Sequence, residues 1–254
     1  MPNVLISEKD ALTAVVTLNR PERRNALTIE LLTELTEALD VMSADSKKRI
    51  LILRGAGKAF CAGLDLQETT LLEKAHQSAE MVARTLLAVS QTRLITIAQV
   101  HGAAVAGGAG LMSACDFVIA AEGTKIGYPE GRRGLVAGLV MTFLRRQLRE
   151  RHIRELLFTG DLINAERARE IGLVSRVVPR DELETETERL VSSIRQNAPN
   201  ALANTKKLIE ELWSSSVRQD IERALRHHME ARESAEAKEG INAFLEKRLP
   251  NWAA

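Results

Sequence analysis

Along the first half of this chain, short continuous runs of hydrophobic residues alternate with segments in which hydrophobic residues recur every three or four positions. Short runs rich in β-branched residues are typical of buried strands. Such runs occupy residues 4–6, 14–18, 50–54, 94–100 and 116–121. Between them, apolar side chains recur every three or four residues, which predicts a helix that begins near Thr28 and another over residues 67–92. Strands that alternate with helices predict an α/β fold.

From about residue 135 onward the patterns are mostly helical. A helix that begins at Ala165 is expected to end at a Gly172 cap, and a strand is expected over residues 174–178. The last quarter of the chain has no strand pattern and has the spacing of amphipathic helices. The expected division is a core over residues 1–195 and a helical oligomerisation region over residues 196–254.

Two predicted strands lead directly into glycine-rich turns. The first turn runs from Gly55 to Leu66, and the second runs from His101 to Gly110. An apolar run that starts at Leu111 predicts a helix after the second turn. N–H groups at the start of a helix have no partner within it and can hold an anion. Two such turns can direct two N–H groups at one developing oxyanion.

Composition narrows the class of protein. The chain has 254 residues, 45% of them hydrophobic and 27% charged, with a net charge of +1. That balance fits one large globular domain and argues against a broad nucleic-acid surface. Neither a signal-peptide pattern nor a membrane-spanning apolar run is present in the sequence. Cys61 and Cys115 lack metal-ligand spacing, so we expect buried thiols, no metal and a cytoplasmic protein.

Five ordered segments resemble the crotonase (enoyl-CoA hydratase/isomerase) superfamily. They are Asn19–Leu27, Gly57–Leu66, His101–Gly108, Tyr128–Leu135 and Ala168–Val174. The resemblance implies a crotonase-like spiral of ββα units with a helical C-terminal trimerisation region, assembled as a trimer or a dimer of trimers. It also implies an enzyme that binds an acyl-CoA thioester and works through an enolate anion. No cofactor is implied beyond the coenzyme A of the substrate.

The resemblance assigns roles to individual positions. It places the oxyanion hole at the backbone N–H groups of Leu64 and Gly107, and the general acid/base at Glu130. Partial burial would raise the pKa of that carboxyl towards a useful value. Asp65 is expected to act mainly by fixing the oxyanion turn. The positions implied for binding substrate or coenzyme A are Arg24, Ala26, Ala62, Asp65, Leu66 and Lys247.

Gly110 is the main departure from the family pattern. Hydratases of the family carry a second glutamate there, three residues after the oxyanion glycine. Hydration of a 2-enoyl thioester shares its proton transfers between two carboxylates, whereas a 1,3-proton shift needs one base. The sequence therefore favours an enoyl-CoA isomerase. A hydratase or lyase with a different second acid stays open, as does a non-catalytic acyl-CoA-binding protein.

Polar residues around Glu130 leave further alternatives. Arg132 or Arg133, turned into a pocket, would pair with a carboxylated acyl chain or lower the pKa of Glu130. The alternative is an arginine in solvent or at an interface. The adjacent His227 and His228 lie in a polar helical stretch and are expected to face solvent or an interface. Val136, Leu139, Val140 and Phe143 are expected to line either an acyl pocket or the core.

Overall fold

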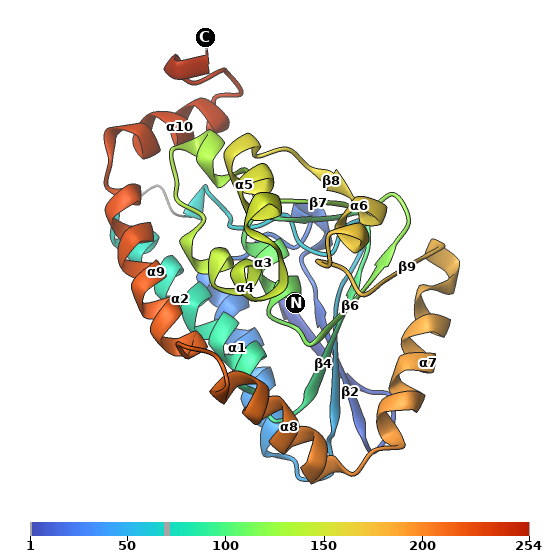
Figure 1. Ribbon diagram of the computed structural model, residues 1–254. Coiled ribbons are helices and arrows are strands. Elements are labelled where there is room, and N and C mark those ends of the chain that lie inside the picture. Colours follow the sequence, from blue (N-terminus) through green and yellow to red (C-terminus); the bar gives the residue numbers. More distant parts are fainter. Residues whose placement is uncertain (1, 69–71, 254) are drawn as a thin grey trace.

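The computed structural model describes residues 2–68 and 72–253, and Figure 1 shows their arrangement. A six-stranded sheet in the order β1-β2-β3-β4-β6-β9 lies at the centre. The first two strands form an antiparallel hairpin, and all later neighbours pair in parallel. The strands are β1 (Val4–Glu8), β2 (Thr13–Leu18), β3 (Ile50–Gly55), β4 (Ile95–Val100), β6 (Phe117–Ala121) and β9 (Arg176–Val178). The predicted α/β fold is confirmed.

Helices bury both faces of this sheet. The helices α1 (Ile29–Ala44) and α2 (Leu72–Gln91) cover one face, and α7 (Leu183–Arg195) covers the other (Figure 1). Alternate residues of one strand therefore join different cores. In β3, Leu51 packs in the larger core and Ile52 in the core beneath α7. Because both faces are covered at β2, β3 and β4, these inner strands are buried and mostly apolar, whereas the edge strand β1 is mostly exposed.

A second, smaller sheet was not predicted. It consists of β5 (Ala103–Val105), β7 (Lys125–Gly127) and β8 (Ile163–Asn164). Each strand has two or three residues, too few for a periodic pattern to reveal. The sheet positions both glycine turns, because β5 lies within the second turn and its Ala104 forms a bridge with Cys61 of the first turn.

Helix boundaries follow the predictions with two differences. Thr28 caps α1 by accepting a hydrogen bond from the Leu31 N–H (3.2 Å), as predicted. The helix α2 begins at Leu72, later than expected. Residue 67 lies in a turn and residue 68 in a 3-10 conformation, and residues 69–71 are outside the described residues. The helix α3 (Gly107–Ser113) begins four residues earlier than expected, so glycines of the second turn form its first turn.

The second half of the chain is mostly helical, as predicted. Its helices are α4 (Gly138–Gln147), α5 (Glu150–Thr159), α6 (Ala165–Glu170), α8 (Pro199–Glu211), α9 (Val217–Arg232) and α10 (Ala235–Leu245). Gly172 follows α6 with a φ of +92°, which fits the predicted glycine cap. Within the described residues, no strand follows β9.

The C-terminal helices fold back on the rest of the chain. The helix α9 packs against α2 and α4, and α10 packs against the short 3-10 helix η3 (Pro129–Arg133). The division between residues 1–195 and 196–254 falls between α7 and α8 and stays a prediction. In the part of the chain that the structure describes, no helix is long and apolar enough to cross a membrane.

Candidate active site

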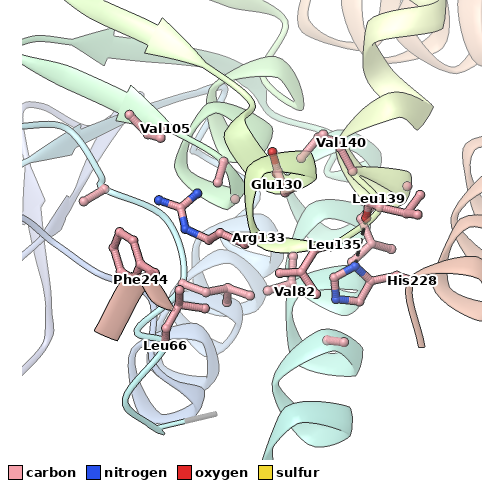
Figure 2. A pocket seen from close by; sticks show the side chains of 18 residues that line it. Leu66, Val82, Val105, Glu130, Arg133, Leu135, Leu139, Val140, His228 and Phe244 are labelled. Carbon is pink, nitrogen blue, oxygen red and sulfur yellow. Dashed lines mark hydrogen bonds between the residues drawn. The ribbon is translucent and has the colours of Figure 1, made fainter. Parts of the chain in front are cut away.

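One pocket gathers residues from distant parts of the sequence (Figure 2). We call it the Glu130 pocket. Both glycine turns, η3, α2, α4, α9 and α10 contribute to it. Its lining residues are Ala62, Leu64, Leu66, Ala79, Val82, Val105, Ala106, Gly107, Glu130, Arg133, Leu135, Val136, Ala137, Gly138, Leu139, Val140, His228 and Phe244. The three residues predicted for chemistry, Leu64, Gly107 and Glu130, therefore lie around one cavity.

The backbone hydrogen bonds of the first glycine turn do not use the Leu64 N–H. Leu27 and Leu64 form an isolated parallel bridge. In it, the Leu27 N–H donates to the Gly63 carbonyl (2.8 Å) and the Asp65 N–H donates to the Leu27 carbonyl (2.9 Å). These bonds use the groups on either side of Leu64. Among the described residues, the Leu64 N–H thus has no backbone acceptor, and Leu64 lines the pocket.

Asp65 holds this turn through Arg20. Two guanidinium nitrogens of Arg20 lie 3.3 Å from Oδ2 of Asp65, and Arg20 also donates to the Ala26 carbonyl (2.6 Å). Both side chains are mostly buried. Asp65 therefore helps to hold the first glycine turn, and the described lining of the Glu130 pocket does not include it.

The second glycine turn brings the backbone at Gly107 close to the first glycine turn at Gly63. Gly107 is the first residue of α3, so its N–H has no acceptor within the helix. A Cβ atom at Gly63, where φ is +94°, would lie 2.9 Å from the Val105 carbonyl oxygen and 3.7 Å from the Gly107 nitrogen. The two backbones can approach this closely only because residue 63 lacks a side chain.

Glu130 is buried in η3 and lines the same pocket. Its exposed fraction is 9%. Burial raises the pKa of Glu130 to about 7, and its own backbone N–H and the nearby Arg133 limit the rise. Its Oε2 atom is buried without a hydrogen-bond partner among the described residues. A carboxyl with this pKa can both take and return a proton near neutral pH.

Position 110 offers no side chain, and the space beside it is filled. A Cβ atom at Gly110 would lie 2.7 Å from Cγ1 of Val140 and 3.8 Å from Cδ2 of Leu86. Val140 is 3% exposed and lines the Glu130 pocket. Glu130 is the one carboxylate among the lining residues that the structure describes.

The predicted binding residues divide into two groups. Ala62 and Leu66 line the pocket. Arg24 and Ala26 lie beside it. The Ala62 N–H donates to the Arg24 carbonyl (3.0 Å), and Ala26 directly precedes Leu27, which forms a bridge with Leu64. Lys247 is exposed just after α10. The part of the lining that the structure describes does not include Arg24, Ala26 or Lys247.

His228 is a pocket residue that the sequence analysis missed. We expected it to face solvent or an interface, and that was wrong: it is 6% exposed and lines the Glu130 pocket. Its Nδ1 atom lies 3.1 Å from the Val136 carbonyl oxygen, a group that can only accept, so Nδ1 carries the proton. The signal was present, because His228 follows Val217 and Ile221 on the buried face of α9.

Comparisons with known proteins place the chain among acyl-CoA enzymes. A family model described as enoyl-CoA hydratase/isomerase matches residues 8–254. A Thermus thermophilus protein with the provisional name of enoyl-CoA hydratase is 40% identical, over 94% of this chain and 96% of its own. The crotonyl-CoA hydratase of Syntrophomonas wolfei is 34% identical, over 98% of this chain and 97% of its own.

A solved structure shares the fold. The crystal structure of an enoyl-CoA hydratase from Mycobacterium avium superposes with a TM-score of 0.87 and 31% sequence identity. The match covers 99% of each chain.

Proposed function

Because this chain belongs to the enoyl-CoA hydratase/isomerase family, we propose that it catalyses a 1,3-proton shift in an enoyl-CoA thioester, with Glu130 as its base. The family and the crotonase fold predicted from the sequence are both confirmed. The family acts on acyl-CoA thioesters and needs no cofactor beyond the coenzyme A of the substrate. The relatives are named hydratases, so the preference for isomerisation rests on this chain's own residues.

One observation carries the proposal: Glu130 is the one carboxylate among the lining residues that the structure describes, and position 110, beside the lining residue Val140, is a glycine. The N–H groups of Leu64 and Gly107 donate to the thioester oxygen of a bound 3-enoyl-CoA. The Glu130 carboxylate takes a proton from C2, and the electrons of that C–H bond move to the oxygen as a dienolate forms. The Glu130 carboxylic acid then returns the proton to C4, which leaves the double bond between C2 and C3.

The oxyanion hole and the base each lower the barrier of the proposed proton transfer. One preorganised backbone donor contributes about 3 kcal/mol to stabilising a developing oxyanion. Proton transfer by a positioned carboxyl contributes roughly 10²–10⁴-fold when its pKa lies near the working pH. The buried Glu130 meets that condition, with a pKa of about 7.

Hydration is the second candidate, and two observations favour it. The relatives carry hydratase names, and His228 lines the same pocket as Glu130. A neutral His228 with its proton on Nδ1 presents Nε2 as an acceptor, which can orient a water or a substrate hydroxyl. A non-catalytic acyl-CoA-binding protein is the third candidate, and a buried Glu130 with a raised pKa counts against it.

Exposed apolar side chains support the predicted oligomer. On and just after α8, the exposed fractions are 52% for Leu208, 60% for Ile209, 78% for Leu212 and 40% for Trp213. Large apolar side chains exposed this close together in the sequence are typical of an interface in soluble proteins. We propose that α8 contacts a second copy of the chain in a trimer or a dimer of trimers. The cytoplasmic location also stays a prediction.

A paired turnover assay tests the function. One arm supplies a short 3-enoyl-CoA and follows the absorbance of the conjugated 2-enoyl product. The other arm supplies a 2-enoyl-CoA and follows its loss, with Glu130→Gln measured in both arms. Conjugation that falls at least about a hundredfold in Glu130→Gln supports the isomerase. Hydration without conjugation refutes it in favour of the second candidate. Binding without turnover in either arm favours the third.

A further inference from the structure

Arg133 brings a positive charge to the Glu130 pocket. The residue ends η3 and lines the pocket (Figure 2). Its Nη1 atom donates to the Pro129 carbonyl (3.1 Å), and its guanidinium carbon lies 4.3 Å from the centroid of the Phe244 ring. Its Nε atom is buried without a hydrogen-bond partner among the described residues. The guanidinium thus retains donors that its own chain leaves unused.

The neighbouring Arg132, unlike Arg133, is exposed and has an acidic partner. Its side chain is 57% exposed, pairs with Asp161, and donates through Nη2 to the Thr159 carbonyl (2.9 Å). Arg133 has no carboxylate within ion-pair distance in the part of the chain that the structure describes. Adjacent arginines therefore differ: Arg132 is paired at the surface, and Arg133 lacks an anionic partner in the pocket.

The packing of α10 holds Arg133 in place. A Cβ atom at Gly240 would lie 2.5 Å from the Arg133 carbonyl carbon, and one at Gly134 would lie 2.4 Å from the Glu236 carbonyl carbon. Two glycines thus allow α10 to lie directly on η3. This close packing puts Phe244 under the guanidinium, where the ring supports it by a cation–π contact.

The charge of Arg133 is poorly balanced within the pocket. Most of the other lining residues are apolar, and the nearest acid, Glu130, has a pKa raised to about 7 by burial. Glu130 therefore carries only part of a negative charge at neutral pH. A partly buried cation without a full counter-ion is costly, and an anion that enters the pocket would remove that cost. Guanidinium groups bind carboxylates with two parallel hydrogen bonds.

We propose that Arg133 makes the Glu130 pocket selective for acyl-CoA thioesters whose acyl group carries a free carboxylate. The inference rests on the proposed function, because it assumes that the acyl group occupies this pocket. The phosphates of coenzyme A are common to every acyl-CoA, so only a charge on the acyl group distinguishes these substrates from neutral ones.

Binding of saturated thioesters tests this selectivity without turnover. Calorimetry would compare malonyl-, succinyl- and glutaryl-CoA, each with its own monomethyl ester. The ester keeps the chain and removes the charge. We expect at least one acid to bind about tenfold more tightly than its ester, which corresponds to about 1.4 kcal/mol. Equal dissociation constants for acid and ester at all three lengths would overturn the proposal, whether or not the protein is an isomerase.

Matched variants assign the selectivity to one residue. Arg133→Met should bring each acid and its ester to within about twofold. Arg132→Met, a control at the neighbouring position, should keep the wild-type preference. An unchanged preference in Arg133→Met, or its loss in Arg132→Met, would contradict the assignment. If Arg133→Met does not fold by circular dichroism, Arg133→Lys replaces it and should reduce the preference without abolishing it, because lysine keeps the charge but not the planar fork.

Discussion

The Cγ1 atom of Val140 lies 2.7 Å from the position that a Cβ atom of residue 110 would occupy. Val140 on α4 therefore occupies the space into which a longer side chain at Gly110 would extend. Where a second carboxylate would extend from residue 110, the side chain of Val140 on α4 fills the space instead. A single substitution at position 110 cannot restore the carboxylate without moving Val140.

Gly110→Glu tests this relationship. The single variant should lose roughly 1–3 kcal/mol of stability, because overpacking forces Val140 aside. Adding Val140→Ala should recover part of that loss and raise hydration of a 2-enoyl-CoA at least about tenfold above wild type. Thermal unfolding and hydration assays would measure both effects, with Val140→Ala alone as the control. If Gly110→Glu were as stable as wild type, Val140 could move aside without cost, and the predicted clash would be contradicted.

The activity should follow the ionisation of Glu130. Only the carboxylate form takes a proton, so kcat/KM for a 3-enoyl-CoA should rise with pH and reach half its maximum near pH 7. Arg133 favours the charged form and limits the pKa rise. Arg133→Met should therefore move the midpoint to higher pH, and Arg132→Met should move it less. A midpoint near 4.5, the ordinary glutamate pKa, would contradict a buried base.

The stability of the protein should depend on the same group. Because the folded-state pKa of Glu130 is raised from 4.5 to about 7, folding favours its protonated form. The contribution of Glu130 to the free energy of unfolding should therefore fall as pH rises from 4.5 to 7, by up to about 3 kcal/mol. Glu130→Gln removes this loss, so it should be more stable than wild type above pH 7 and similar below pH 4.5. Denaturant titrations at several pH values would decide, and identical pH profiles would disagree with this expectation.

Gly63 and Gly123 form a matched pair for testing the oxyanion turn. Both have positive φ, +94° and +72°, so alanine strains either backbone by roughly 1–2 kcal/mol. A Cβ atom at Gly63 also meets the Val105 carbonyl, whereas one at Gly123 meets nothing within 4 Å. Gly63→Ala should therefore lower kcat about a hundredfold, and Gly123→Ala should only lower Tm. Equal kcat in the two variants would argue against the oxyanion role.

Leu212→Asp tests the proposed interface. Leu212 is 78% exposed beyond the end of α8, so the change should leave the fold of one subunit intact. A buried carboxylate at an interface should shift the oligomer towards monomer. Light scattering coupled to gel filtration would measure the mass, with Val41→Asp, at another exposed apolar position (58%), as the control. A wild-type monomer would refute the interface outright.

Much of the fold follows from local patterns in the sequence. Six strands, the Thr28 cap and the Gly172 helix end are encoded by β-branched runs, a capping side chain and a residue suited to positive φ. The short strands β5, β7 and β8 escaped prediction because pairing with distant partners defines them, not their own periodicity. The start of α3 at Gly107 was not predicted either, because the glycines of its first turn have low intrinsic helix propensity.

By itself, the sequence determined the family, the α/β class and the two glycine turns, because these depend on residue type and spacing along the chain. Only the tertiary structure decided which side chains meet. It separated Arg133 from Arg132, buried His228 through the packing of α9, and filled the space beside Gly110 with Val140. Those outcomes depend on how α4, α9 and α10 fold back onto the core. The spacing along α9 indicates that His228 lies on its buried face, but no local pattern shows which residues of other elements a side chain will contact.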